Sequence, residues 1–283
     1  MNAAIEVVDL RKNYGDQEAV AGISLTILRG EIFAILGPNG AGKTTTVEIL
    51  EGFRKRDGGT VNVLGADPGA LGIHAAVWRN QIGIVLQSTS DAAELTVAET
   101  VHHFSHYYTS PKDPDFVISQ VGLTEKRDAR IRTLSGGQRR RLDVALGIIG
   151  SPEILFLDEP TTGFDPEARR AFWDLIRTLK AEGTTILLTT HYLDEAEALA
   201  DRVAVISAGK IIEIATPSTL GGRHLAKATI SWLENGTTQK KISENPTHDV
   251  IEIASRFNGD IPELTVTRPS LEDIYLTMIE DQS

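Results

Sequence analysis

One eight-residue segment restricts the fold of this chain more than any other feature of its sequence. Residues 37–44 read Gly-Pro-Asn-Gly-Ala-Gly-Lys-Thr, which matches the spacing G-x-x-x-x-G-K-[ST]. A fully apolar run, Ile32–Leu36, precedes this segment, and a stretch with helical character from about Lys43 to Glu51 follows it. A buried strand, a glycine-rich turn and a helix in this order predict an α/β fold whose turn binds phosphate groups.

The residue types of the turn indicate which phosphate compound it takes. Glycines let successive backbone N–H groups point at one anion, and the helix N-terminus adds partial positive charge. Lys43 supplies a point charge for the β- and γ-phosphates, and the Thr44 hydroxyl is a ligand that Mg²⁺ prefers. We therefore expect ATP and Mg²⁺ as cofactors. The expected nucleotide-binding residues here are Gly37, Pro38, Asn39, Gly40, Ala41, Gly42, Lys43, Thr44 and Thr45.

A second apolar run supplies two carboxylates for the same chemistry. Ile154–Leu157 reads as a buried strand, and Asp158 and Glu159 follow it directly. Ligands of parallel sheets bind at the carboxyl ends of the strands. Asp158 is therefore expected to hold Mg²⁺ through water, and Glu159 to orient or deprotonate the water that attacks the γ-phosphate.

A third motif lies between these two and indicates the family. Residues 134–138 read Leu-Ser-Gly-Gly-Gln, and two glycines at a helix N-terminus make a second anion site beside a serine side chain that is free to bind phosphate. Together the three motifs resemble those of the ABC-transporter ATPases (the ATP-binding cassette family). The resemblance implies a homodimer in which two ATP molecules are sandwiched head to tail. Each signature would complete the nucleotide site of the opposing subunit through Ser135, Gly136, Gly137 and Gln138.

The same resemblance assigns roles to three further residues. It implies that Tyr14 stacks on the adenine ring, that Gln87 reaches Mg²⁺ and the attacking water, and that His191 contacts the γ-phosphate. The segment 160–165 reads Pro-Thr-Thr-Gly-Phe-Asp, where the family more often has Ser-Gly-Leu-Asp after the first residues. Since the glycine and the aspartate are kept, we expect this loop to pass between the two subunits.

Local patterns predict where helices begin and where turns lie. Thr96 with Glu99, and Ser135 with Gln138, are capping boxes that open helices. Asp165-Pro166 reads as the N-cap and first position of another helix, with a stop at Gly183. Ala208-Gly209 reads as the turn of a hairpin. Strands alternating with helices predict right-handed crossovers and a mostly parallel sheet.

These elements predict the organisation of the whole chain. We expect an ATP-binding domain over residues 1–218, with the core of a P-loop NTPase, N-terminal antiparallel strands and a helical subdomain at about 88–150. Residues 217–222 read as a linker. A small α+β accessory domain at 219–283 follows, with a dimer-stabilising or regulatory role.

Composition excludes several classes of protein. The chain has 28 Lys and Arg against 39 Asp and Glu, a net charge of −11, which argues against a nucleic-acid partner held by broad phosphate neutralisation. It contains no cysteine, so disulfides and thiolate chemistry are ruled out. No apolar run approaches the ~20 residues of a membrane span, and the N-terminus lacks a signal-peptide pattern. We expect a cytoplasmic protein, peripheral at the inner face of the cell membrane through a permease partner.

Two side-chain clusters have simpler interpretations than a metal site or a nucleic-acid site. His102 and His106 have the i, i+4 spacing of a metal pair, with His103 between them and Glu99 nearby, but a polar helix face is the better interpretation. The run at 139–141, three arginines, is expected to form a solvated face that also places positive charge near the phosphates.

The leading hypothesis is an ATP-hydrolysing transporter subunit that dimerises on ATP and powers export of a small, hydrophobic, drug-like compound. The end of the chain, RPSLEDIYLTM, and the segment EGFRKRDGGTVNVLGADP resemble the drug- and antibiotic-export branch. An importer ATPase remains an alternative. So does a soluble cassette ATPase acting on nucleic acid or ribosomes, although the long coiled coil of the repair members is missing between the phosphate turn and the Leu-Ser-Gly-Gly-Gln motif. A non-catalytic ATP-binding regulator is disfavoured because Glu159 and His191 are both present.

Overall fold

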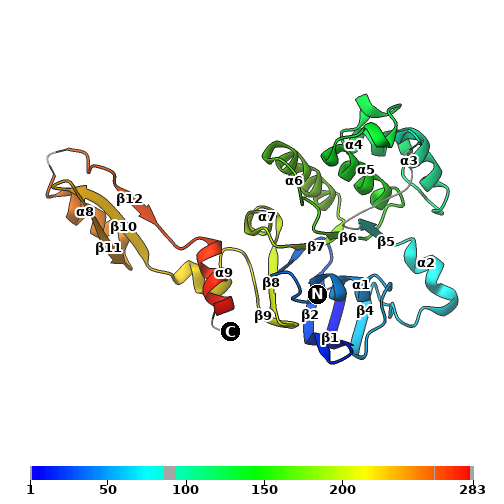
Figure 1. Ribbon diagram of the computed structural model, residues 1–283, viewed down its shortest axis with the longest axis horizontal. Coiled ribbons are helices and arrows are strands. Elements are labelled where there is room, and N and C mark those ends of the chain that lie inside the picture. Colours follow the sequence, from blue (N-terminus) through cyan, green and yellow to red (C-terminus); the bar gives the residue numbers. More distant parts are fainter. Residues whose placement is uncertain (1, 86–93, 258, 281–283) are drawn as a thin grey trace. The chain divides into compact units, whose positions relative to one another are not determined.

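The structure is a computed structural model that describes residues 2–85, 94–257 and 259–280. It divides into two compact units, Met1–Ile214 and Ala215–Ser283 (Figure 1). The boundary expected from the sequence, after residue 218, falls a few residues later in the chain. Each unit is described by itself below.

A six-stranded sheet forms the centre of the first unit, in the order β5-β6-β7-β3-β8-β9. Its strands are β3 (Ile32–Leu36), β5 (Ile82–Val85), β6 (Ile154–Asp158), β7 (Thr185–Thr190), β8 (Arg202–Ser207) and β9 (Lys210–Ala215). The first five positions of this order pair in parallel. Every residue of β3, β6 and β7 is buried, as expected for parallel strands covered on both faces. The expected α/β fold of a P-loop NTPase is confirmed.

The strand order brings three chain segments to one edge of this sheet. Leu36 at the end of β3 pairs with Thr190 at the end of β7, and Asp158 at the end of β6 pairs with Thr189. The segments that follow these three strands therefore leave the sheet side by side. This edge carries the glycine-rich turn, the Asp-Glu pair and His191.

The expected antiparallel strands form a second sheet, in the order β2-β1-β4. It consists of β1 (Ala3–Tyr14), β2 (Gln17–Leu28) and β4 (Gly58–Val63). The strand β4 is not among those expected from the sequence. Alternate residues of β1 and β2 are buried, and Leu10 and Ile23 share one apolar core with Phe33 and Phe156 of the parallel sheet. This shared core fixes Tyr14, at the end of β1, relative to the parallel sheet.

Helices make up much of the rest of the first unit. They are α1 (Lys43–Leu50), η1 (Gly72–His74), α2 (Ala75–Arg79), α3 (Val97–Ser105), α4 (Pro114–Gln120), η2 (Thr124–Lys126), η3 (Ile131–Thr133), α5 (Gly136–Ile148), α6 (Pro166–Ala181) and α7 (Leu193–Leu199). Both capping boxes are formed, at the starts of α3 and α5, and Asp165 caps α6. The first residues of the helical subdomain expected at about 88–150, and Gln87, lie outside the described residues.

Close packing of α5 on β5 depends on two glycines. A Cβ atom at Gly83 would lie 2.1 Å from the carbonyl oxygen of Gly147. Side chains at this crossing would push the helix off the sheet. The helix that begins at the Leu-Ser-Gly-Gly-Gln motif is thus seated directly on the parallel sheet.

The second unit is a small α+β domain with its own core. Its elements are η4 (Leu220–Leu225), β10 (Ala228–Glu234), β11 (Thr237–Ser243), α8 (Pro246–Ala254), β12 (Thr265–Thr267) and α9 (Leu271–Glu280). The sheet order is β11-β10-β12, and Ile230, Trp232 and Ile253 pack together. The linker expected at 217–222 is partly wrong, because Leu220 is buried and opens the short helix η4.

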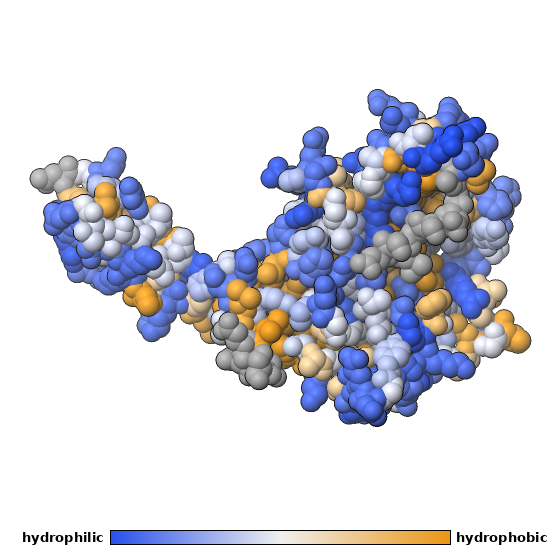
Figure 2. Space-filling model, viewed as in Figure 1, coloured by the Kyte–Doolittle hydropathy of each residue, from blue (hydrophilic) through white to orange (hydrophobic). Residues whose placement is uncertain are grey.

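Most of the surface drawn in Figure 2 is hydrophilic, and apolar surface lies near α2 in the first unit. Ile73 and Val77 are exposed there, at 93% and 67%. Across the described ranges, no helix combines the length and apolar character that crossing a bilayer requires.

Candidate functional site

The glycine-rich turn fits its place because two of its glycines touch other backbone segments. A Cβ atom at Gly37 would lie 2.3 Å from the carbonyl oxygen of Ile206. Gly42 has a φ of +97°, and a Cβ atom there would lie 2.3 Å from the carbonyl oxygen of Ala19. A side chain at either position would displace the turn, which sits between β3 and α1.

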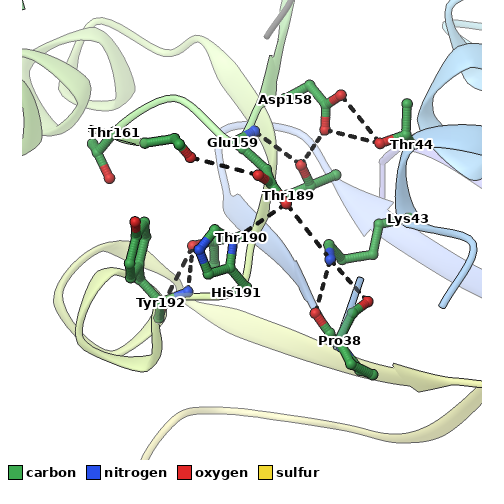
Figure 3. Close-up of polar contacts among 12 residues, drawn as sticks. Pro38, Lys43, Thr44, Asp158, Glu159, Thr161, Thr189, Thr190, His191 and Tyr192 are labelled. Carbon is green, nitrogen blue, oxygen red and sulfur yellow. Dashed lines mark hydrogen bonds and ion pairs between the residues drawn. The ribbon is translucent and has the colours of Figure 1, made fainter. Parts of the chain in front are cut away.

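Lys43 lies inside this turn and is almost fully buried. Its side chain is 5% exposed, and Nζ donates to the carbonyl oxygens of Gly37 at 2.8 Å and Pro38 at 3.2 Å (Figure 3). Nζ also lies 3.7 Å from Oε1 of Glu159. Burial lowers the pKa of Lys43, whereas Glu159 and Asp158 raise it. The ammonium group is therefore held at the mouth of the turn, facing a carboxylate.

Two oxygen donors meet beside Lys43. The Thr44 hydroxyl lies 3.2 Å and 3.5 Å from the two carboxylate oxygens of Asp158, and the Thr189 hydroxyl donates to Asp158 as well (Figure 3). Hydroxyl and carboxylate oxygens are the protein ligands that suit Mg²⁺. The residues present therefore fit a magnesium ion.

A third carboxyl group is buried near this point. Glu51, directly after α1, is 7% exposed. Burial, with smaller contributions from the charges of Asp158 and Glu48, raises the pKa of Glu51 to about 8. Folding therefore favours the protonated form of Glu51 at neutral pH, while Asp158 keeps its hydroxyl partners.

Glu159 is held at the same edge with an uncommon backbone conformation. Its φ is +44°, in the left-handed region, and its N–H donates to the hydroxyl of Thr189 at 3.0 Å. Its Oε1 lies 3.2 Å from Nδ1 of His191, so the carboxylate sits between the imidazole and the ammonium of Lys43 (Figure 3). An ordered carboxylate in this position can accept a proton from a water molecule.

A pocket of about 460 Å³ opens over these groups. It is lined by Tyr14, Gln17, Ala19, Asn39, Gly40, Gly42, Lys43, Thr44, Thr45 and Glu159. The Tyr14 side chain is 41% exposed, and the cationic groups of Arg54 and Lys12 lie 5.3 Å and 5.7 Å from its ring centroid. The pocket thus combines an aromatic ring, the phosphate turn and the carboxylate of Glu159.

The Leu-Ser-Gly-Gly-Gln motif occupies a different place. Ser135 and Gly136 are exposed at the start of α5, and none of residues 135–138 belongs to the described lining of the pocket. The Ser135 side chain forms the expected capping box, because its Oγ accepts from the N–H of Gln138 at 3.2 Å. The Gln138 side chain in turn accepts from the N–H of Ser135. The hydroxyl hydrogen of Ser135 still allows it to donate to an anion.

The arginine run at 139–141 is only partly the solvated face that we expected. Arg140 is 6% exposed and donates to the carbonyl oxygens of Asp158 and Pro160. The spacing of apolar residues could have predicted the burial of Arg140. Val144 and Ile148 follow it by one and two turns on the same helix face, and both are buried. A run of three arginines considered by itself does not show this helical spacing.

The histidine cluster stays a polar helix face. His106 uses Nδ1 on the carbonyl oxygen of His102, His103 contacts the hydroxyl of Tyr107, and His102 lies 3.5 Å from Asp115. Among the described residues, the one group with metal-binding spacing is His248, Asp249 and Glu252. Lys241 pairs with both acids of that group.

Sequence reasoning missed three contributors to the site. Thr189 connects Asp158 to Glu159, and its signal was its position at the carboxyl end of a buried strand just before His191. Gln17 and Ala19 line the pocket from β2, and no local pattern marks them. The structure thus brings Tyr14, the phosphate turn, Asp158, Glu159 and His191 together.

Comparisons with known proteins agree with this arrangement. The family model described as ABC transporter matches residues 20–162. The Nod factor export ATP-binding protein I of Ralstonia nicotianae is 43% identical over 222 residues, which cover 76% of this chain and 68% of the relative. The daunorubicin resistance ATP-binding protein DrrA3 of Streptomyces coeruleorubidus is 34% identical, over 99% of this chain and 97% of its own length. Among solved structures, cbiO1 from Clostridium perfringens, part of the ABC transporter complex cbiONQ, superposes with a TM-score of 0.70 at 30% identity, over 77% of this chain and 90% of that chain.

Proposed function

This chain belongs to the ABC transporter family as an ATP-binding subunit that hydrolyses ATP, and from that premise we propose that it powers export of a small compound through a separate membrane permease. One observation supports the proposal most: three separate segments of the chain bring Lys43 and Thr44, Asp158 and Glu159, and His191 together at or beside one pocket. The relatives named for Nod factor export and for daunorubicin resistance support export of a hydrophobic, drug-like compound.

The pocket matches the parts of ATP in order. The aromatic ring of Tyr14 lines the pocket and would stack on the base, an interaction worth about 1–3 kcal/mol where it has been measured for nucleobases. The backbone N–H groups of the turn and the ammonium of Lys43 take the β- and γ-phosphates. These contacts bind ATP before any chemistry occurs.

The oxygen donors beside the phosphates would hold the metal. Thr44 and Asp158 are the ligands proposed for Mg²⁺, together with Gln87. The ion, when bound, supplies charge that neutralises the phosphate oxygens. Because Thr44 follows the phosphate turn and Asp158 ends β6, the ion would be held between these two segments.

The hydrolytic step falls to Glu159. Its carboxylate accepts a proton as a water oxygen attacks the γ-phosphorus, and the bond between that phosphorus and the β–γ bridging oxygen breaks to give ADP and phosphate. His191, 3.2 Å from Glu159, is placed to hold the carboxylate and contact the γ-phosphate. The two residues act on one reacting centre.

A head-to-tail homodimer is the proposed working form. The signature residues 135–138, of which Ser135 and Gly136 are exposed, offer N–H groups and a hydroxyl at the start of α5, outside the described pocket lining of their own chain. The phosphates of an ATP molecule bound to an opposing subunit would then bind at this anion site. Binding would close the dimer and hydrolysis reopen it, and the motion would pass to the permease.

The proposed place of work is the cytoplasmic face of the cell membrane, beside the permease. The exposed apolar side chains Ile73 and Val77 support contact of the first unit with another protein. ATP is supplied on that side, so the pocket must open there.

The Glu159→Gln variant tests the proposal. Loss of the proton acceptor should lower ATP turnover by about 100-fold or more while ATP still binds. Light scattering should show a shift from monomer to dimer only with Mg-ATP, and Glu125→Gln, an exposed carboxylate elsewhere, should behave as wild type. Undiminished turnover would contradict the role of Glu159. An unchanged mass with ATP bound would contradict dimer formation by nucleotide alone.

A further inference from the structure

Arg140 lies where the signature helix meets the catalytic strand. It belongs to α5, which begins at the signature, yet its side chain is directed into the protein and is only 6% exposed. Its Nη2 donates to the carbonyl oxygen of Asp158 at 2.8 Å, and its Nε donates to the carbonyl oxygen of Pro160 at 3.0 Å. These two carbonyl groups stand immediately before and after Glu159 in the chain.

The backbone at Glu159 needs such support. Its φ of +44° lies in a region that residues with a Cβ atom rarely adopt, and such conformations persist only where surrounding contacts enforce them. Thr189 accepts the N–H of Glu159 through its hydroxyl at 3.0 Å and its carbonyl oxygen at 3.2 Å. Arg140 and Thr189 therefore hold this turn from two sides.

The guanidinium is suited to this task by its shape and its charge balance. Its planar fork of donors reaches two carbonyl groups at once, which a single ammonium group matches less well. Asp143, one turn further along α5, lies 4.0 Å from it, and the two side chains are 7% and 10% exposed. Burying a guanidinium and its carboxylate partner costs desolvation free energy, so packing alone does not account for this pair.

We propose that Arg140 is a positioning residue for ATP hydrolysis: by bonding the carbonyl oxygens on both sides of Glu159, it holds the carboxylate between Lys43 and His191. The inference rests on the proposed role of Glu159 as the proton acceptor. Arg140 does not touch the nucleotide, so its effect reaches the reaction through Glu159.

The test uses the full chain with Arg140→Gln and Arg140→Lys, each of which keeps donors at this point. A displaced carboxylate should lower kcat by about 10- to 100-fold, because small misplacement of a reacting group costs that much. The ATP dissociation constant and the melting temperature should change little, and Arg140→Lys should retain more activity than Arg140→Gln. Arg177→Gln is the matched control, since Arg177, an exposed residue of α6, also donates to a backbone carbonyl, that of Ala198 in α7.

A double-mutant cycle with Glu159→Gln separates positioning from general support of the structure. If Arg140 acts through Glu159, adding Arg140→Gln to Glu159→Gln should lower the residual rate no further and should leave ATP-driven dimerisation intact. An equal loss in both backgrounds, or a kcat of Arg140→Gln equal to wild type, would overturn the inference. High turnover by Glu159→Gln itself would instead refute the proposed function.

Discussion

The hydroxyl of Thr44 lies 3.2 Å from a carboxylate oxygen of Asp158, although 114 positions of sequence separate them. This contact joins the phosphate turn to the end of β6 without any other molecule. It places a hydroxyl and a carboxylate at one point, where a magnesium ion has suitable ligands.

Lys43→Ala should lose tight ATP binding. The ammonium is buried and already faces the carboxylate of Glu159, so its removal leaves the phosphates without a fixed positive partner. Hydrogen bonds to charged groups contribute about 1.5–3 kcal/mol each, which corresponds to a loss of roughly 10- to 100-fold in affinity. Titration calorimetry measures it, with exposed Lys210→Ala as the control. An unchanged affinity would remove Lys43 from the phosphate site.

Tyr14→Ala should weaken binding of ATP but not of inorganic tripolyphosphate. The ring lines the pocket without belonging to the phosphate turn, and only a ligand with a base can stack on it. The expected loss for ATP is about 10-fold, and Tyr14→Phe should keep most of the affinity. Equal losses for both ligands would indicate that Tyr14 supports the fold of the pocket instead.

Gly42→Ala should destabilise the protein more than Gly183→Ala. Both glycines have nearly the same φ, +97° and +98°, but only the new Cβ atom at position 42 meets backbone, at 2.3 Å from Ala19. A positive φ alone costs about 1–2 kcal/mol, so Gly183→Ala should lose about that amount and Gly42→Ala more. Urea unfolding gives both values, and equal losses would show that the turn shifts freely.

Glu51→Gln should stabilise the protein increasingly as pH rises. Burial, Asp158 and Glu48 raise the pKa of Glu51 from 4.5 to about 8 in the folded state. At pH values between 4.5 and about 8, Glu51 is ionised in the unfolded chain but stays protonated in the folded chain. The free energy of unfolding of the wild type therefore falls as pH rises through this range.

The variant lacks this titration, and its advantage should therefore grow from about pH 4.5 and level off near pH 8, at up to a few kcal/mol. Urea unfolding without nucleotide or metal measures the difference at several pH values. Glu6→Gln, at an exposed position of β1, should show no such slope. A difference that does not change with pH would mean that Glu51 is ionised in the folded protein.

Deletion of residues 219–283 should weaken dimerisation and leave the nucleotide site intact. The second unit has its own core of Ile230, Trp232 and Ile253, while the pocket lies wholly in the first unit. ATP affinity should therefore be unchanged in the truncated chain. Light scattering of the truncated and full-length Glu159→Gln proteins with Mg-ATP compares their dimers. Equal dimerisation would exclude a dimer-stabilising role for this unit.

The sequence alone predicted those parts of the structure that depend on residues close together in the chain. The capping pairs Thr96–Glu99 and Ser135–Gln138 formed as predicted, because each satisfies backbone N–H groups within one turn of its own helix. The phosphate turn followed from its glycines, and the apolar run before Asp158 became a fully buried strand. The roles of Tyr14 and His191 came from family resemblance rather than from any local pattern.

The tertiary structure alone decided which distant groups share the site. Strand order placed β7 between β6 and β3, so the Thr189 hydroxyl came to link Asp158 and Glu159, and β2 supplied Gln17 and Ala19 to the pocket wall. The burial of Arg140 depends on what lies under α5, which a run of three arginines does not reveal. Composition and spacing determined the phosphate turn and its helix, because their hydrogen bonds close within a few residues. The contacts that aim Glu159 join segments far apart in the chain, and only packing of the sheet and helices brings them within bonding distance.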